Sequence, residues 1–175
     1  ALRNDPRFPD KPTSTTIEPA FEYPANGANE AGSNYGNQLL AFLSPTVTGD
    51  YVFYLCSDDP SELYLSTDEN PANKKLIAQE TAWSNARQWV ASGGSSDLTS
   101  KRSDQFAASE WPTPNVIRLT AGKLYYMEAL HTEGGGGDNV GATWQLPGAA
   151  EPVDGAPPIP GANLFTYLNP DVSTA

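Results

Sequence analysis

The chain has 175 residues, of which 38% are hydrophobic and 10% aromatic, so it is a globular protein long enough to bury a core. Its 21 Asp and Glu outnumber its 10 Lys and Arg, and the formal net charge is -11. Such a surface repels phosphate backbones and anionic lipid, which disfavours nucleic-acid partners and membrane surfaces, and it favours cations. No apolar run reaches transmembrane length, so no membrane insertion is expected.

The first half of the chain reads as strands and turns. Residues 1–35, rich in Pro, Asn and Gly, predict irregular wrapping structure. The stretch "NQLLAFLSPTVTGDYVFYLCS" (37–57) predicts two strands joined as a hairpin. Both faces of the second strand are apolar or aromatic, which indicates a central strand covered on both sides. Cys56 is the sole cysteine, so no disulfide can form within the chain and a buried structural thiol is expected.

Further along the chain the pattern stays β-rich. "SELYLST" (61–67) and "LIAQE" (76–80) predict short strands, "TAWSNARQWVA" (81–91) one short helix, and residues 92–115 a long polar surface loop. "VIRLTAGKLYYMEALHTE" (116–133) predicts a hairpin, and "VGATWQL" (140–146) a further strand. These elements predict an all-β fold with long loops and at most one short helix. We expect one domain over residues 1–148, followed by a Pro/Gly-rich segment, 149–175, that wraps the domain or links to a neighbour.

Two neighbouring carboxylates, Asp58 and Asp59, follow the most apolar strand. Adjacent like charges raise each other's pKa unless a cation shares them. Neighbouring side chains of an extended strand point to opposite faces, so both could hold one ion only if the backbone bends sharply, as at a cis peptide bond. An Asp-Pro turn is the competing explanation, because Pro60 comes next.

A second candidate for chemistry is "EGGGGDN", residues 133–139. Four glycines lose much conformational entropy when they become ordered, and a cation bound by their carbonyl oxygens would compensate for this loss. A floppy turn between strands explains the same letters. The two stretches together supply carboxylate and carbonyl oxygens without thiolate, and His131 is the chain's one histidine, so the ligands favour calcium over zinc.

The stretches "GDYVFYLCSDDPSELYLS", "IRLTAGKLYYMEALHTEGGGGDN" and "VGATWQLPG" resemble the protective-antigen fourteen-kilodalton domain family, β-sandwich modules of adhesins, flocculins and glycosidases. The resemblance spans roughly residues 35–148 and implies an antiparallel β-sandwich. In sugar-binding members, two consecutive aspartates joined by a cis peptide hold a calcium ion, and Asp58 and Asp59 match them. A second loop completes the metal shell, which assigns Gly135, Gly137 and Asp138 as ligands here, with Glu133 and Gly136 in reserve.

The resemblance implies a calcium-dependent carbohydrate-binding module in which the ion (Ca2+) coordinates vicinal hydroxyls of a sugar. The residues then expected to contact the sugar are Asp58, Asp59, Asp138, Asn139, Trp89 and Trp111, although core packing is the ordinary role of a single tryptophan. A structural or assembly module of a larger extracellular protein, or an accessory domain of a glycoside hydrolase, is the alternative. We expect no catalysis in this chain, secretion or cell-surface display, and other domains in the parent protein.

Overall fold

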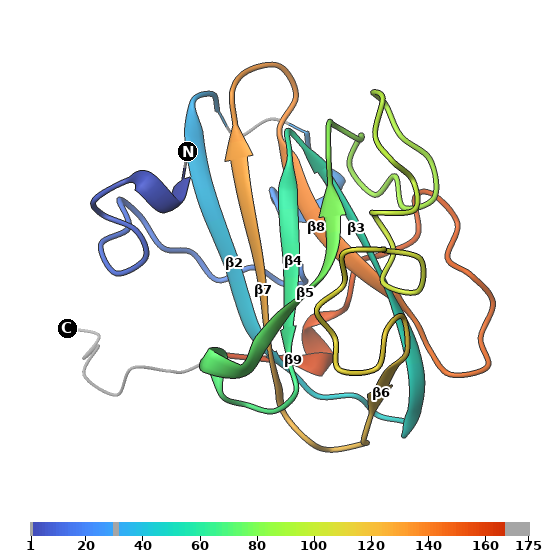
Figure 1. The fold of residues 1–175 in the computed structure, drawn as a ribbon. Coiled ribbons are helices and arrows are strands. Elements are labelled where there is room, and N and C mark those ends of the chain that lie inside the picture. The colour runs from blue at the N-terminus through green and yellow to red at the C-terminus, as the bar shows by residue number, and fades with distance from the viewer. Residues whose placement is uncertain (1, 30–31, 167–175) are drawn as a thin grey trace.

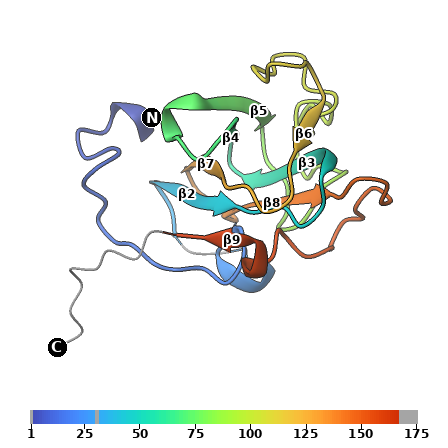
Figure 2. The same ribbon diagram turned by 90° about the horizontal axis from the view of Figure 1, so that it is seen from below.

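Two antiparallel sheets pack face to face in the computed structural model, which describes residues 2–29 and 32–166 (Figures 1 and 2). The four-stranded sheet has the order β1 (Glu22–Tyr23), β8 (Asn139–Gln145), β3 (Gly49–Asp58) and β6 (Ile117–Leu119). The five-stranded sheet has the order β5 (Lys74–Glu80), β4 (Ser61–Ser66), β7 (Tyr125–Glu133), β2 (Tyr35–Leu43) and β9 (Leu164–Phe165). Helical structure among the described residues is limited to single 3-10 turns at Leu2–Asn4, Ala25–Gly27, Pro71–Asn73 and Gly161–Asn163. The predicted all-β sandwich is therefore confirmed.

The alternation of β3 explains how the two sheets hold together. Tyr51, Phe53 and Leu55 point into the main core between the sheets, and each fully buried side chain of this size stabilises the fold by about 1.5–3 kcal/mol. Tyr54 and Cys56, on the other face of β3, form a second apolar cluster. The prediction of a strand covered on both sides is confirmed. Burial raises the pKa of the Cys56 thiol to about 12, as expected of an inert structural cysteine.

Both predicted hairpins are wrong, because each joins strands of different sheets. Strand β2 lies between β7 and β9, whereas β3 lies between β8 and β6. Likewise β6 pairs with β3, whereas β7 pairs with β2 and β4. Hydrophobic alternation identifies the buried face of a strand but does not identify its neighbour. These connections cross from one layer to the other, as expected where two sheets share one core.

The helix predicted for residues 81–91 is also wrong. This segment forms turns and one bridge to β3, and Arg87 has a φ of 57°, outside the right-handed helical region. A buried lysine from the next loop fixes the segment instead. Lys101 is 0% exposed, and its ammonium donates to Ser84 Oγ (2.7 Å) and to the carbonyl oxygens of Gln88 (2.8 Å) and Ala91 (2.5 Å).

The loop of residues 92–115, expected to lie in solvent, covers one side of β3. The amide of Leu55 donates to the carbonyl of Lys101, and that of Ser103 donates to the carbonyl of Phe53, both at 2.9 Å. Lys101, Ser103, Phe106 and Trp111 are buried. The loop is thus polar in sequence and packed in structure.

The chain after β8 stays in contact with the sandwich as far as it is described. Ile159 is fully buried and its amide donates to the carbonyl of Ala142 at 2.9 Å, while Leu164 and Phe165 form β9 beside β2. Residues 149–166 therefore wrap the sandwich, and residues 167–175 of the predicted tail lie outside the described part. Among the described residues, no helix has the length and apolar character needed to span a membrane.

Strand register brings two loops together at one end of the sandwich. Asp58 at the end of β3 is opposite Asn139 at the start of β8, and Ser61 at the start of β4 is opposite His131 near the end of β7. The β3–β4 turn and the β7–β8 loop therefore leave the same edge, at the top of Figure 1. Tyr35, the first residue of β2, is opposite Glu133, so the segment before β2 reaches this end as well.

Candidate metal centre

Three carboxylates converge where these loops meet. One oxygen each of Asp58, Asp59 and Glu133 lies within 4.8 Å of the others, and we call these residues the acidic cluster. The peptide bond between Asp58 and Asp59 is cis, the geometry that lets both side chains face one ion. Asp58 and Asp59 are half-buried, whereas Glu133 is 4% exposed. Glu133, which was expected only as an alternative ligand, is thus one of the three clustered carboxylates.

The glycine loop lies directly against the two aspartates. The amide of Gly134 donates to Asp59 Oδ2 at 3.0 Å. A Cβ atom at Gly134 would lie 3.1 Å from Asp59 Oδ2, and one at Gly137 would lie 3.1 Å from Asp58 Oδ2 and clash with the Asn29 amide. Any side chain at 137 would therefore have to displace the Asn29 side chain. The structure brings together the two stretches that the sequence singled out.

Glu133 is an unusual residue to find buried at this position. Neither of its carboxylate oxygens has a hydrogen-bond partner. Burial, together with the charges of Asp59 and Asp58, raises its pKa from 4.5 to about 7. Burial and the charge of Asp59 likewise raise the pKa of Asp58 from 3.8 to about 6. A buried unpaired charge is costly, so this arrangement calls for protons or for a cation.

Asp138 and Asn139 anchor the loop rather than face solvent. Asp138 is 0% exposed; its Oδ2 accepts from the amide of Gly32 at 2.6 Å, and its own amide donates to the carbonyl of Asn29 at 3.2 Å. The Asn139 side-chain amide donates to Asn29 Oδ1 (2.6 Å) and to the Ser84 carbonyl (3.0 Å). The expected sugar contact of Asn139 is therefore not supported, because its amide is buried and bonded within the protein. The segment before β2, expected only to wrap the domain, supplies Asn29 and Gly32, and the segment after β5 supplies Ser84.

His131 contacts the backbone of the aspartate turn. Its Nε2 lies 2.7 Å from the carbonyl oxygen of Asp58, and its Nδ1 lies 3.0 Å from the side-chain oxygen of Asn37. Burial lowers the pKa of His131, and Nε2–H donates to Asp58 because a carbonyl oxygen can only accept. The edge of the ring also meets Tyr35, with ring centroids 6.2 Å apart. The histidine thus positions the turn through backbone contact.

Sequence reasoning missed Trp83, the aromatic residue that the structure places beside the aspartates. Trp83 forms an isolated antiparallel bridge with Asp58, and its indole lies over the backbone of Gly93 and Gly94, where a Cβ at either position would clash with the ring. The side chain is 38% exposed. The signal available in the sequence was the Gly93-Gly94 pair. It could not be interpreted without knowing that residues 81–91 are not helical.

Trp89 and Trp111 do not lie at the surface of this site. Trp89 is 1% exposed, packs against Tyr54 and Cys56, and donates through Nε1–H to the Ala156 carbonyl at 2.9 Å. Trp111 is 8% exposed and belongs to the main core. Their burial removes the basis for the sugar contact expected of either indole; both have the core role that is ordinary for tryptophan.

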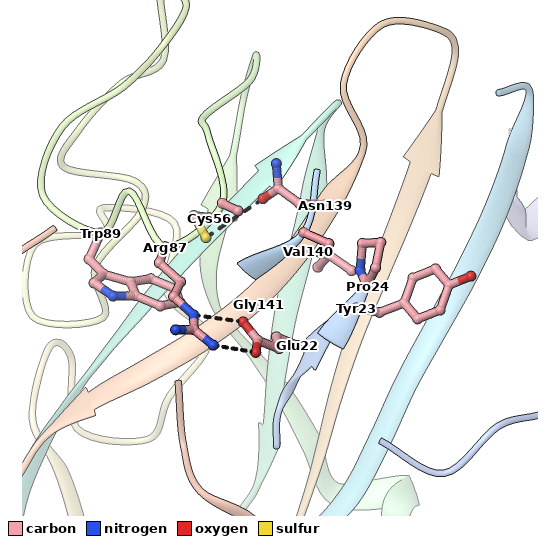
Figure 3. Close-up of a pocket in the computed structure, with 11 residues that line it drawn as sticks. Glu22, Tyr23, Pro24, Cys56, Arg87, Trp89, Asn139, Val140 and Gly141 are labelled. Atoms are coloured by element: carbon pink, nitrogen blue, oxygen red, sulfur yellow. Dashed lines mark hydrogen bonds and ion pairs between the residues drawn. The ribbon is translucent and has the colours of Figure 1, made fainter. Parts of the chain in front are cut away.

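Figure 3 shows the surroundings of Trp89, with Arg87 paired to Glu22 and Asn139 directed toward the sulfur of Cys56. The cavity among these residues measures about 10 Å³, room for about one water molecule. It is too small for a sugar.

Fold and site together define a two-sheet antiparallel β-sandwich with an acidic cluster on the loops at one end. The model of the PA14 domain family matches residues 2–156, and the chain belongs to this family, which confirms the resemblance. A mouse (Mus musculus) protein, N-acetyl-beta-glucosaminyl-glycoprotein 4-beta-N-acetylgalactosaminyltransferase 1, is 34% identical over 151 residues. The match covers 84% of this chain but only 13% of the transferase, so the chain spans a small part of that relative's length.

Among solved structures, the chain resembles the A domain of epithelial adhesin 6 from Candida glabrata, which was solved in complex with Galb1-3GlcNAc. The TM-score is 0.50 at 14% sequence identity, and the match covers 77% of this chain and 52% of the adhesin chain. At this identity the likeness supports the shared fold, in agreement with the sandwich described above.

Proposed function

We propose that the chain is a calcium-dependent carbohydrate-binding module whose ion is held by the acidic cluster. The observation that carries the proposal is Glu133, a buried carboxylate with no hydrogen-bond partner that converges with Asp58 and Asp59. A divalent cation would compensate all three charges at once. Calcium fits best, because it takes six to eight oxygen ligands in flexible geometry and accepts carboxylate and carbonyl oxygens together.

The ligands would come from both stretches. The three carboxylates of the acidic cluster would bind the ion from one side, and carbonyl oxygens of the glycine loop, at Gly135 and Gly137, would complete the shell. Gly136 and Asp138, from the same loop, are the alternative ligands. Because Asp58 and Asp59 are half-buried rather than enclosed, coordination positions toward solvent would remain for two adjacent hydroxyl groups of a sugar.

Trp83 would form one wall of the sugar site. Its backbone pairs with that of Asp58 and its indole is 38% exposed, and aromatic faces pack well against the C–H-bearing face of a pyranose. The glycine pair beneath the ring fixes its orientation. Calcium would thus bind the hydroxyl groups while Trp83 covers an apolar face of the same sugar.

The comparisons support this proposal at a coarser level. The chain belongs to the PA14 domain family, and the structurally similar adhesin domain was solved with a glycan bound. An adhesin-like fold also favours secretion or cell-surface display of the parent protein. The match covers only 13% of the mouse transferase, which favours this chain being one domain of a longer protein.

An accessory role within a glycan-modifying enzyme is the second candidate, and the mouse transferase is the observation that favours it. In that setting the chain would still bind a glycan and would bring the catalytic domain to it. Catalysis by the acidic cluster is disfavoured by its spacing. Its oxygens lie within 4.8 Å of one another, whereas the two carboxyl groups of a glycosidase stand roughly 5–9.5 Å apart across the scissile bond.

The test is a glycan array read with calcium and with a chelator, on the wild type, on Asp58→Asn and on Asp59→Ala. We expect binding that disappears with the chelator and in both variants, while circular dichroism shows an intact β fold. Glu69→Gln is the matched control, because Glu69 is exposed in the β4–β5 turn, away from the site. Binding that survives chelation would reject the metal mechanism. Absence of any binding would favour a structural module instead.

A further inference from the structure

The acidic cluster holds more negative charge than one calcium ion can neutralise. Three carboxylates carry -3 when ionised, and a bound divalent ion brings +2, so -1 remains. Asp138 adds to this excess, since its charge acts on both Asp58 and Glu133. Asp58 and Asp59 alone would balance the charge of a calcium ion. Glu133, with both oxygens unpartnered and 4% exposure, is the third carboxylate and adds the excess negative charge. This reasoning rests on the proposed function.

Basic side chains do not offset the excess. Of the 10 Lys and Arg in the chain, seven form ion pairs with acids elsewhere: Arg3, Arg7, Lys74, Arg87, Lys101, Arg102 and Arg118. None of the ion pairs among the described residues involves the acidic cluster. The metal-loaded site therefore remains an anionic surface within a chain of net charge -11.

We propose that this residual charge makes the site selective for uncharged sugars, and that Glu133 is the residue that sets the selectivity. The ligand class is a neutral glycan with a free vicinal diol. A sugar that carries a carboxylate or a sulfate next to the coordinated hydroxyls, such as a uronic acid or a sulfated hexose, meets the excess charge and binds less well.

The size of the effect follows from Coulomb's law. One residual charge about 7 Å from a ligand carboxylate, at an effective dielectric constant of about 35–50, between that of a protein surface and that of water, weakens binding roughly five- to tenfold at low salt. Salt screens charges at a surface, because the Debye length falls to about 3 Å in 1 M salt. The discrimination should therefore shrink as sodium chloride is added, whereas discrimination by shape would not.

The experiment compares matched sugars on an array at saturating calcium: galactoside with galacturonide, glucoside with glucuronide, and mannoside with mannuronide. The wild type should bind the best neutral sugar at least about fivefold more tightly than its uronide. Glu133→Gln removes one charge and keeps the shape of the side chain, so the ratio should fall toward one. Glu69→Gln removes one charge at the other end of the sandwich and should leave the ratio unchanged.

Terbium provides a second measurement that needs no variant. A trivalent ion in the same site brings +3 against the -3 of the acidic cluster, so the neutral-to-uronide ratio of the wild type should fall when Tb3+ replaces Ca2+. Equal binding of both sugars by the wild type, or a ratio that neither Glu133→Gln nor terbium changes, would overturn the inference while leaving calcium-dependent binding intact. Failure of the wild type to bind any neutral sugar with calcium would contradict the proposed function, and this inference with it.

Discussion

Replacing Glu133 with glutamine should stabilise the metal-free protein and weaken its response to calcium. Without metal, the ionised side chain is buried beside two other carboxylates and has no hydrogen-bond partner. Its pKa is raised from 4.5 to about 7, which means that the fold disfavours its charged form. The penalty is absent below pH 4.5 and is complete above pH 7, so stability falls as the pH rises through this window.

The magnitude follows from the shift. One pKa unit corresponds to about 1.4 kcal/mol, so a rise from 4.5 to about 7 places an upper limit of about 3 kcal/mol on the penalty. Solvent beside the half-buried aspartates screens part of this, which leaves about 2 kcal/mol. For a chain of this size, about 2 kcal/mol corresponds to a rise in Tm of roughly 4–8 °C. Glu133→Gln should show this rise at pH 8 in chelator, and little change at pH 4.

Calcium should reverse the order of the two proteins. A ligand at a hundredfold excess over its Kd stabilises the fold by about 2.7 kcal/mol. The wild type should gain this amount at a calcium concentration at which Glu133→Gln gains little, since the variant has one charge fewer on the ion. The assay is thermal unfolding followed by circular dichroism, in chelator and over a calcium series, with Glu69→Gln as control. A variant that is less stable than the wild type in chelator at pH 8, or equally stabilised by calcium, would refute the reasoning.

Three further predictions follow from the contacts described above. Calcium affinity, measured by isothermal titration, should fall at least about tenfold from pH 8 to pH 5, because protons compete for Asp58 and Glu133, whose pKa values are raised to about 6 and about 7; a flat profile would contradict the assigned ligands. Trp83→Ala should reduce glycan affinity about tenfold and leave calcium affinity unchanged, and a parallel loss of both would indicate that Trp83 only supports the loop. Lys101→Met should destabilise the fold to urea by about 3–5 kcal/mol, because it leaves the buried charge of Glu80 without its partner; adding Glu80→Gln should restore much of this, and an unstable double variant would point to lost packing instead.

Alternation and turn chemistry were sufficient to predict the all-β class and the central position of β3. Tyr51, Phe53 and Leu55 have to share a face because their spacing is two, and this holds whatever the strand pairs with. Strand pairing was beyond the same argument. β2 and β3 look like the arms of a hairpin in sequence, yet they belong to different sheets, because the closing contacts are made with strands far away in the chain.

The candidate site was also predicted only in part, because some of its residues depend on packing between distant segments. Asp58, Asp59 and the glycine loop each follow a strand, and it was the family resemblance that implied that the two stretches meet, because the hydrophobic pattern alone did not identify which strands are neighbours. Glu133 was harder to weigh, because its importance comes from burial without a partner, which depends on three-dimensional packing. Trp83 was hidden by a short stretch of helical spacing, which the buried ammonium of Lys101 overrides. Propensity is a weak signal in segments of this length.

A crystal structure of the protein with calcium tests the central claim most directly. The anomalous data should be collected at a wavelength where calcium gives a measurable anomalous signal. We predict one anomalous peak between Asp58, Asp59 and Glu133, with carboxylate and glycine-loop carbonyl oxygens about 2.3–2.6 Å away and solvent molecules in the outward positions. A map with no peak at these residues, or with calcium held at another place on the surface, would contradict the account.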